Sequence, residues 1–202
     1  MTNKQKLIIA FLSIILMLFV FSYYDFKSWH SHFQKHNKRD DRIVERIASF
    51  MEDEGFTLGR EKLLETARSI YKVSKQYGID YRLMLAIIKI ESNFKHNVVS
   101  PKGARGLLQI KPSLAKFIAK DAGVLWKGIK TLDEPEKNIR IGVFFFSRLL
   151  EDFDNIYLAL NAYNMGPTKL KNILKEKKSH DGNFSTQVLR EYKNITTILP
   201  PP

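Results

Sequence analysis

The sequence predicts an all-α protein, in which one mainly helical domain is preceded by an N-terminal transmembrane helix. Apolar residues recur at intervals of three and four residues in successive segments after residue 60, which is typical of amphipathic helices. No run of residues alternates strictly between apolar and polar side chains, as a half-buried strand would. Residues 7–24 carry no charge, and a helix of that length, rising about 1.5 Å per residue, just crosses the hydrocarbon core of a bilayer.

Residues 1–25 are interpreted as a cytoplasmic tail followed by a signal-anchor that stays in the cell membrane. Lys4 and Lys6 precede the apolar run, and a basic N-terminus favours a single-pass orientation with the rest of the chain on the extracytoplasmic side. The basic residues that follow the run compete with this orientation. The run ends in bulky residues, including Tyr23 and Tyr24, whereas signal peptidase requires small side chains. We therefore expect an uncleaved anchor.

Residues 26–60 are predicted to form a juxtamembrane stalk, and residues 61–202 the globular domain. Ile43, Ile47 and Phe50 lie on one helical face in the stalk, which predicts a short amphipathic helix able to dock on the domain. His32 and His36 have the spacing of a helical metal site, but no third ligand lies at a suitable distance along the chain. We predict no metal and no cofactor.

The expected helices of the domain follow from periodicity and end signals. Gly78 is a good stop for the first helix, Asp80 a good N-cap for the second, and Pro112 a tolerated first position for the third. The helix after residue 135 is apolar on most sides, which predicts a central helix surrounded by the others. Two further helices are expected at residues 155–166 and at about 186–197.

Glu91 ends an apolar stripe on the second of these helices. Met84, Ile87 and Ile88 precede it at positions that share its helical face. A carboxyl group that loses water there is kept neutral at higher pH, so that it can serve as an acid catalyst. The alternative is that Glu91 lies where the helix reaches the surface and is solvated or paired with a lysine.

Polar residues in two later segments are further candidates. Gln109 lies between apolar neighbours in a loop that contains Gly103 and Gly106, and its amide would bind either a sugar or the loop backbone. Tyr163 and Asn164 lie near the end of the apolar helix at residues 155–166. A tyrosine in that position is either a core residue with a solvated hydroxyl group or a residue that orients a catalytic carboxyl group.

Three motifs in order resemble those of the soluble-lytic-transglycosylase type of peptidoglycan lyase, a family related in fold to goose-type lysozyme. They are Glu91-Ser92, residues 106–109 (Gly-Leu-Leu-Gln) and residues 162–164 (Ala-Tyr-Asn). Leu108 stands where the family usually has Met, a change that conserves volume. The resemblance covers approximately residues 61–197.

The resemblance implies a lysozyme-like fold with a groove for the glycan strand of peptidoglycan. It implies that Glu91 protonates the glycosidic oxygen and then accepts the proton of the muramoyl 6-hydroxyl group, which leaves a 1,6-anhydro end. It further implies that Ser92 and Gln109 bind substrate, and that Tyr163 forms a hydrogen bond with Glu91 and places it, with Asn164 beside it.

The residues near the motifs support a mechanism with one acid. Most glycosidases use two carboxyl groups, but Asp80 is expected to cap one helix, and Asp133 with Glu136 another. A single acid requires help from the substrate, for example from an N-acetyl group.

Three alternatives remain: a goose-lysozyme-type hydrolase of the same bond, a non-catalytic protein of cell-wall binding or assembly, and a nucleic-acid binder. The formal charge of +12 and the absence of cysteine are compatible with all three. No zinc ligands, phosphate-binding glycine loop or basic-aromatic cluster support the last one, so we predict no nucleic-acid partner.

Overall fold

The computed structural model describes residues 17, 19, 21–24, 26, 27, 38–176 and 182–202. The chain divides into two compact units, Met1–Arg42 and Ile43–Pro202. In the first unit, the described residues between 17 and 27 are helical. The predicted membrane span at residues 7–24 and the histidines at positions 32 and 36 fall largely or wholly outside the described residues. Among those that are described, no helix combines the length and the apolar composition that a membrane span requires.

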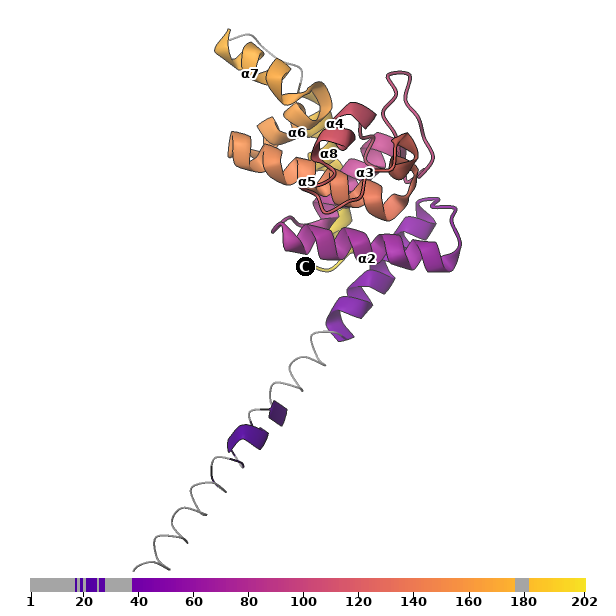
Figure 1. Ribbon diagram of the computed structural model, residues 1–202, viewed down its shortest axis with the longest axis vertical. Coiled ribbons are helices and arrows are strands. Elements are labelled where there is room, and N and C mark those ends of the chain that lie inside the picture. The colour runs from indigo at the N-terminus through magenta and orange to yellow at the C-terminus, as the bar shows by residue number, and fades with distance from the viewer. Residues whose placement is uncertain (1–16, 18, 20, 25, 28–37, 177–181) are drawn as a thin grey trace, which may run out of the picture. The chain divides into compact units, whose positions relative to one another are not determined.

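The second unit is built from helices, as Figure 1 shows. Its described residues contain no strand; two isolated bridges, Val99 with Arg105 and Arg105 with Ile110, fold the loop at 99–110 onto itself. Residues 43–53 are helical. The elements that follow are α2 (Arg60–Gln76), α3 (Tyr81–Ser92), α4 (Pro112–Ile118), the 3₁₀ helix η1 (Ile129–Asp133), α5 (Pro135–Phe153), α6 (Ile156–Met165), α7 (Pro167–Lys175) and α8 (Asn183–Ile198). The mainly helical fold class is therefore confirmed.

Helix α5 is the central helix, as its composition predicts. It contacts α2, α4, α6 and η1, and Figure 1 shows it between α2 and α6. Ile139, Ile141, Val143 and Phe146 on α5 have no exposed surface. A helix that is apolar on several sides must be covered on several sides. The apolar residues of α5 can therefore all be buried only if the helix lies in the middle of the unit.

The helix at residues 43–53 belongs to the compact unit. Ile43, Ile47 and Phe50 are between 0% and 7% exposed, so the docking expected of this amphipathic segment is observed. The predicted stalk ran to residue 60, whereas the compact unit begins at Ile43. The reason is that the apolar face of this helix is buried against the core.

Several hydrogen bonds fix the start of α3, the helix that carries Glu91. Asp80 caps it as predicted, since its Oδ1 accepts from the backbone nitrogen of Arg82 at 2.9 Å, and the Arg82 guanidinium also binds the Asp80 carboxylate. The Tyr192 hydroxyl group on α8 donates to Asp80 Oδ2 at 2.9 Å. The Tyr81 hydroxyl group donates to the carbonyl of Pro200 at 2.5 Å. The C-terminal segment thereby holds α3 in place.

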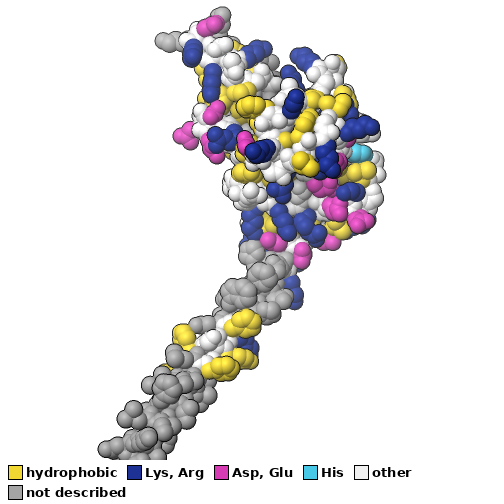
Figure 2. Space-filling model, viewed as in Figure 1, with side chains coloured by type: hydrophobic (Ala, Val, Ile, Leu, Met, Phe, Trp, Pro, Cys, Tyr) yellow, Lys and Arg dark blue, Asp and Glu magenta, His cyan; other side chains and the backbone are white. Residues whose placement is uncertain are grey.

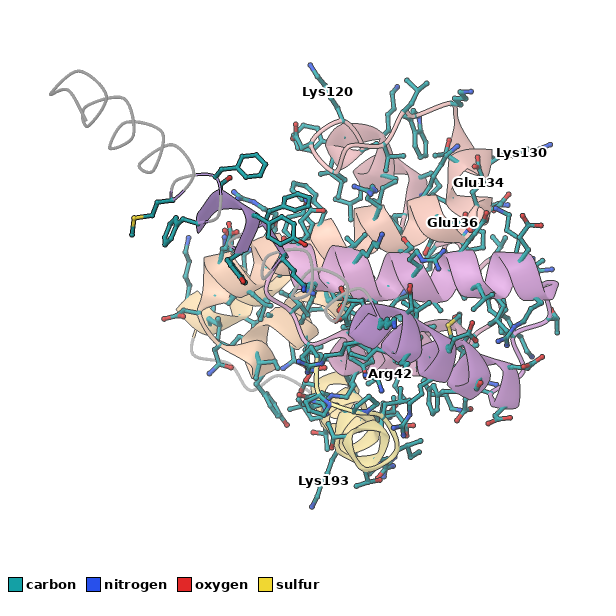
Figure 3. All side chains as sticks on the ribbon, turned by 90° about the horizontal axis from the view of Figure 1, so that it is seen from below. Arg42, Lys120, Lys130, Glu134, Glu136 and Lys193 are labelled. Atoms are coloured by element: carbon teal, nitrogen blue, oxygen red, sulfur yellow. The ribbon has the colours of Figure 1, made fainter. Side chains whose placement is uncertain are left out.

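The expected cap formed by Asp133 and Glu136 is wrong. Both carboxylate oxygens of Asp133 accept from the Arg105 guanidinium, at 2.9 and 3.0 Å, so Asp133 holds the loop before α4. Glu136 pairs with Lys62 on α2, with 3.3 Å between Nζ and Oε1. Glu134 is the residue that precedes α5 and makes no side-chain cap; Figure 3 shows it beside Glu136 at the start of that helix.

Candidate active site

Glu91 lies in the last turn of α3, at the wall of a groove. The helix ends because Asn93 adopts a left-handed conformation, with φ of 49°. Phe94, which also has positive φ (59°), is fully buried and anchors the chain there. Burial raises the pKa of Glu91 to about 7, because the ionised carboxylate loses hydration. The carboxyl group is therefore about half protonated at neutral pH, as the apolar stripe predicted.

The groove has a volume of about 630 Å³. It is lined by α3 through Glu91, by the loop and start of α4 (Ser100, Lys102, Ala104, Gln109, Ile110, Lys111, Leu114), by α5 (Phe145), and by α6 and α7 (Tyr163, Asn164, Met165, Gly166, Pro167, Lys169). Of the described residues that line it, Glu91 is the single acid. A volume of this size accommodates several sugar rings or a comparable ligand.

The loop at residues 105–109 is held by Asn138, a fully buried residue on α5. The Asn138 amide nitrogen donates to the carbonyls of Arg105 (2.9 Å) and Leu132 (3.0 Å). Its Oδ1 accepts from the backbone nitrogen of Leu108 at 2.9 Å. One amide therefore binds three backbone groups of the loop and of η1, and the Arg105 carbonyl also accepts from the backbone nitrogen of Ile110 at 3.0 Å. The sequence offered one signal for this role, a polar residue in the most apolar helix.

Gly106 is required for this loop to pack on α5. Its φ is +77°, and a Cβ atom added there would lie 2.2 Å from Asn138 Nδ2 and 2.6 Å from the carbonyl oxygen of Leu132. A side chain at this position would therefore push the loop away from its clamp. Leu108 in turn packs on Gly142, where an added Cβ would lie 2.4 Å from Leu108 Cδ1. Two glycines thus allow the close packing of this loop on α5.

Gln109 lines the groove, but its amide nitrogen is used by the loop. Nε2 donates to the carbonyls of Gly106 (2.9 Å) and Val98 (3.1 Å). The backbone of Gln109 has positive φ (46°), a conformation that these bonds help to hold. Of the two roles expected for this residue, the structure shows the one in which it satisfies loop carbonyls, and only Oε1 is left for a ligand.

Tyr163 lines the groove from α6, and its ring is fixed by aromatic neighbours. Phe145 and Phe146 lie with ring centroids 5.5 and 6.0 Å away, and Phe184 on α8 stacks on it at 6.5 Å. Burial raises the pKa of Tyr163 well above its ordinary value, and the nearby charge of Glu91 adds to this effect. The hydroxyl group of Tyr163 is therefore neutral. It lies close enough to Glu91 for the carboxylate charge to oppose its ionisation.

The direction of any hydrogen bond between Tyr163 and Glu91 is fixed by Leu108. The Tyr163 hydroxyl group donates to the carbonyl oxygen of Leu108, at 2.7 Å. A phenol has one proton to donate, so toward Glu91 this oxygen can act only as an acceptor. The physical reason is the loop: once Asn138 has pulled Leu108 inward, its carbonyl group needs a buried donor.

The other two predicted residues lie in different surroundings. Asn164 is exposed and lines the groove. Ser92 is 6% exposed, is not among the groove-lining residues, and donates from Oγ to the carbonyl of Ile88 in its own helix at 3.1 Å. The structure therefore brings Glu91, Gln109, Tyr163 and Asn164 to one groove and leaves Ser92 behind its wall.

Three groove lysines were not predicted as part of the site. Lys102, Lys111 and Lys169 line the groove, all are exposed, and their side chains form no ion pair within the described part of the chain. They come from three separate segments, so only the folded chain brings them together. Beside one acid with a pKa of about 7, they give the groove a positive potential that favours anionic ligands.

No group of three or more His, Cys, Asp or Glu residues in the described ranges is placed to hold a metal ion. The arrangement can nevertheless supply general acid and base chemistry. A half-protonated carboxyl group both donates and accepts a proton near neutral pH.

The chain is similar to bacterial and phage transglycosylases. The family model for the transglycosylase SLT domain matches residues 68–185. A membrane-bound lytic murein transglycosylase F of Yersinia enterocolitica is 27% identical over 154 residues, which cover 71% of this chain and 29% of that protein. An endo-type membrane-bound lytic murein transglycosylase A of Klebsiella pneumoniae is 39% identical over 82 residues, which cover 39% of each chain. Across the first relatives, the match spans 24% to 39% of the relative's length.

Solved structures show the same fold at low identity. An inactive mutant of the lytic transglycosylase Slt of Pseudomonas aeruginosa is 24% identical, with a TM-score of 0.52, and the match covers 71% of this chain and 23% of that one. A complex of the 70-kDa soluble lytic transglycosylase with bulgecin A is 20% identical, with a TM-score of 0.54, and the match covers 75% and 28%. At these identities the likeness concerns the fold, and it agrees with the predicted lysozyme-like arrangement.

Proposed function

The chain belongs to the transglycosylase SLT family, and from this premise we propose that it is a peptidoglycan lytic transglycosylase. The reaction is cleavage of the β-1,4 bond between N-acetylmuramic acid and N-acetylglucosamine without water. One observation carries the proposal: among the described residues that line the groove there is a single acid, Glu91, whose pKa is raised to about 7 by burial. A two-carboxylate mechanism would need a second acid about 5 to 9.5 Å away, and the described lining residues supply none.

Glu91 serves first as the acid and then as the base. Its proton passes to the glycosidic oxygen as the bond from that oxygen to C1 of the muramoyl residue breaks. The departing N-acetylglucosamine carries this proton on its 4-hydroxyl group. The muramoyl 6-hydroxyl group then attacks C1, and its proton returns to the Glu91 carboxylate. The N-acetyl group of the substrate stabilises the developing positive charge, as in the substrate-assisted glycosidases. No water is consumed, and Glu91 ends in its starting state.

Tyr163 orients the protonated carboxyl group. Its own proton is directed to Leu108, so toward Glu91 its oxygen can only accept a hydrogen bond. Before substrate binds, this bond would keep the carboxyl group protonated, and the proton would turn to the glycosidic oxygen once the sugar is in place. Asn164 and the free Oε1 of Gln109 are available to bind the sugar. Ser92 holds the last turn of α3 and acts on Glu91 through the backbone. These roles extend the assignment of Glu91 as the catalytic residue and of Gln109, Tyr163 and Asn164 as substrate-binding residues.

Digestion of purified sacculi by the full chain, followed by mass spectrometry, tests the reaction. We expect muropeptides that end in 1,6-anhydro-N-acetylmuramic acid and are lighter by one water than hydrolytic products. Glu91→Gln removes the proton while keeping the side-chain shape, and should reduce cleavage at least about a thousandfold, the order expected for loss of a sole acid-base group. Hydrolytic products would make the protein a lysozyme-type hydrolase. Binding to sacculi without cleavage would make it a non-catalytic wall protein.

We also propose that residues 7–24 anchor the protein as a single span, with the compact unit on the extracytoplasmic side. The uncharged run supports this, and two of the relatives are named membrane-bound. Alkaline carbonate extraction of membranes should leave the full chain in the pellet, and protease added to intact spheroplasts should degrade the compact unit. Release by carbonate would contradict the anchor, and protection from protease would contradict the orientation.

A further inference from the structure

Three large apolar side chains are exposed in one short segment beyond the groove. Phe117 is 84% exposed, Leu125 71% and Ile129 54%; we refer to them as the apolar trio. Other residues of the same segment belong to the hydrophobic core: Ile118 and Val124 are only 9% and 6% exposed. The trio is therefore a separate outward face of the segment. Large apolar side chains grouped on a surface are typical of a binding site.

The members of the trio come from neighbouring elements of one segment. Phe117 is on α4 and Ile129 on η1, and these two elements contact each other. Leu125 lies in the connection between them. The turn between Ala119 and Val124 is closed by a backbone hydrogen bond of 2.8 Å, which keeps the connection compact. The three side chains thus project from one folded segment, residues 116–130.

Four lysines of the same segment lack acidic partners within the described residues. The same segment contains one acid, Asp121, and within the described residues these lysine side chains form no ion pair. They are Lys116, Lys120, Lys127 and Lys130, all exposed. Figure 3 shows that Lys120 and Lys130 both extend outward from the compact unit, away from its core. Hydrophobic side chains lie among Lys and Arg side chains over part of the face in Figure 2. The segment therefore combines exposed apolar groups with a net positive charge.

We propose that residues 116–130 dock on an anionic lipid surface. The apolar trio would enter the boundary between headgroups and acyl chains, and the four lysines would bind the headgroups, which is how interfacial protein segments hold a bilayer. The lysines are complementary in charge to anionic headgroups. The exposed side chains of Phe117 and Leu125 favour lipid over a glycan strand, because a glycan strand has no hydrocarbon layer in which they could be buried. This contact is additional to an N-terminal span and does not depend on one.

Docking would bring the groove close to the bilayer. Leu114 and Lys111 at the start of α4 line the groove, and Phe117 is near its end. Helix α4 has seven residues and is therefore roughly 10 Å long. The groove would then be held about one short helix away from the headgroups.

Site-specific fluorescence on the full chain tests the proposal. The chain contains no cysteine, so Leu125→Cys gives a single site for an environment-sensitive label. Lys193→Cys is the matched control, because Lys193 is exposed and extends from the opposite side of the compact unit to Lys120 and Lys130 (Figure 3). In proteoliposomes that contain phosphatidylglycerol, we expect a blue-shifted emission at position 125 and none at position 193. In pure phosphatidylcholine, neither label should shift.

Removal of charge provides the second measurement. Lys120→Gln with Lys130→Gln should weaken the binding reported at position 125 by roughly tenfold or more, since each lysine near an anionic surface contributes about fivefold. Arg190→Gln with Lys193→Gln removes the same charge from α8 and should leave the signal unchanged. No shift at position 125 with anionic lipid, an equal shift at position 193, or an equal shift in pure phosphatidylcholine would each overturn the proposal. A shift produced by sacculi but not by vesicles would assign the surface to the wall polymer instead.

Discussion

The hydroxyl group of Tyr163 donates its one proton to the carbonyl group of Leu108, at 2.7 Å. This relationship connects α6 to the loop that forms the groove floor, and it fixes the direction in which Tyr163 can interact with Glu91. A phenol oxygen whose proton is already used can accept from a neutral carboxyl group but cannot donate to a carboxylate. The arrangement therefore favours the protonated, proton-donating form of Glu91.

Tyr163→Phe tests this arrangement. The change leaves the carbonyl of Leu108 without its donor and the protonated Glu91 without its acceptor, while the aromatic packing is retained. We expect kcat to fall about 10- to 100-fold with little change in KM, and the free energy of unfolding to fall by about 1–2 kcal/mol. The measurements are steady-state release of soluble muropeptides and thermal unfolding.

Tyr157→Phe is the control for that variant. The Tyr157 hydroxyl group lies on the exposed side of α6, 2.7 Å from the Thr186 hydroxyl group, and outside the groove. Its loss should leave kcat unchanged. Equal kcat values for the wild type and Tyr163→Phe would show that Tyr163 does not orient the acid.

Gly106→Ala tests the packing of the loop against α5. The added methyl group would overlap Asn138 Nδ2 and the carbonyl of Leu132, so the loop must shift and the three hydrogen bonds of Asn138 must lengthen. We expect a loss of about 3–5 kcal/mol in unfolding free energy, from a strained φ and from overpacking. Activity should fall with it, because Leu108 and Gln109 follow directly in the chain.

Gly103→Ala separates the cost of the strained φ from the cost of the steric overlap. Gly103 has nearly the same φ, +76°, but no atom lies within 4 Å of an added Cβ. It should therefore show only the backbone cost, about 1–2 kcal/mol, with activity retained. If the two variants unfold with equal free energies, the close contact at Gly106 does not constrain the loop.

The local features of the site could be predicted from the sequence, because they depend on neighbours within a few turns. The raised pKa of Glu91 follows from the apolar stripe that ends at this residue, and the cap at Asp80 from its position before the helix. The helical fold follows from the same periodicity.

Contacts between distant segments could not be predicted in this way. Asn138 binds Leu108 across 30 positions, and Arg105 binds Asp133 across 28. The local pattern at Asp133 suggested a helix cap because a cap needs only adjacent residues, whereas its real partner is set by how the loop folds back. The apolar face of the helix at residues 43–53 indicated that it would dock, but periodicity alone does not show which helices it packs against.

The three groove lysines are predicted to attract the anionic groups of the wall polymer. Lys102→Gln, Lys111→Gln and Lys169→Gln together should raise KM for sacculi about tenfold at low ionic strength with kcat nearly unchanged, since rim charges act mainly on encounter. The difference should shrink as salt is added, because screening shortens the reach of exposed charges.

A matched triple variant controls for net charge. Lys72→Gln, Arg190→Gln and Lys193→Gln remove the same charge from exposed positions on α2 and α8. At about 0.1 M salt, where the Debye length is roughly 10 Å, their KM should stay within about twofold of the wild type, because exposed charges outside the groove are then largely screened from it. Equal changes in both triple variants would mean that the overall charge of the chain, and not the groove, determines substrate attraction.

The stability of the protein should depend on pH through Glu91. Its pKa is raised from 4.5 to about 7 in the folded chain, so between these values the folded state binds a proton that the unfolded state has released. The free energy of unfolding must then fall as pH rises through this window and become level above it. The cost of ionising the buried group is roughly 1–3 kcal/mol, given about 1.4 kcal/mol per pKa unit and some remaining solvation.

Glu91→Gln isolates this contribution, because glutamine has the same shape and does not titrate. The variant and the wild type should unfold with similar free energies at pH 4, and the variant should be more stable above pH 7 by the same ~1–3 kcal/mol. Denaturant unfolding of both proteins in detergent across this range provides the measurement. Activity of the wild type should instead decline as pH rises through about 7, where the folded protein loses the acid form, since the first step requires the proton. If the two stability curves ran parallel from pH 4 to pH 9, Glu91 would be an ordinary solvated carboxylate, and the basis for its role as the acid would be lost.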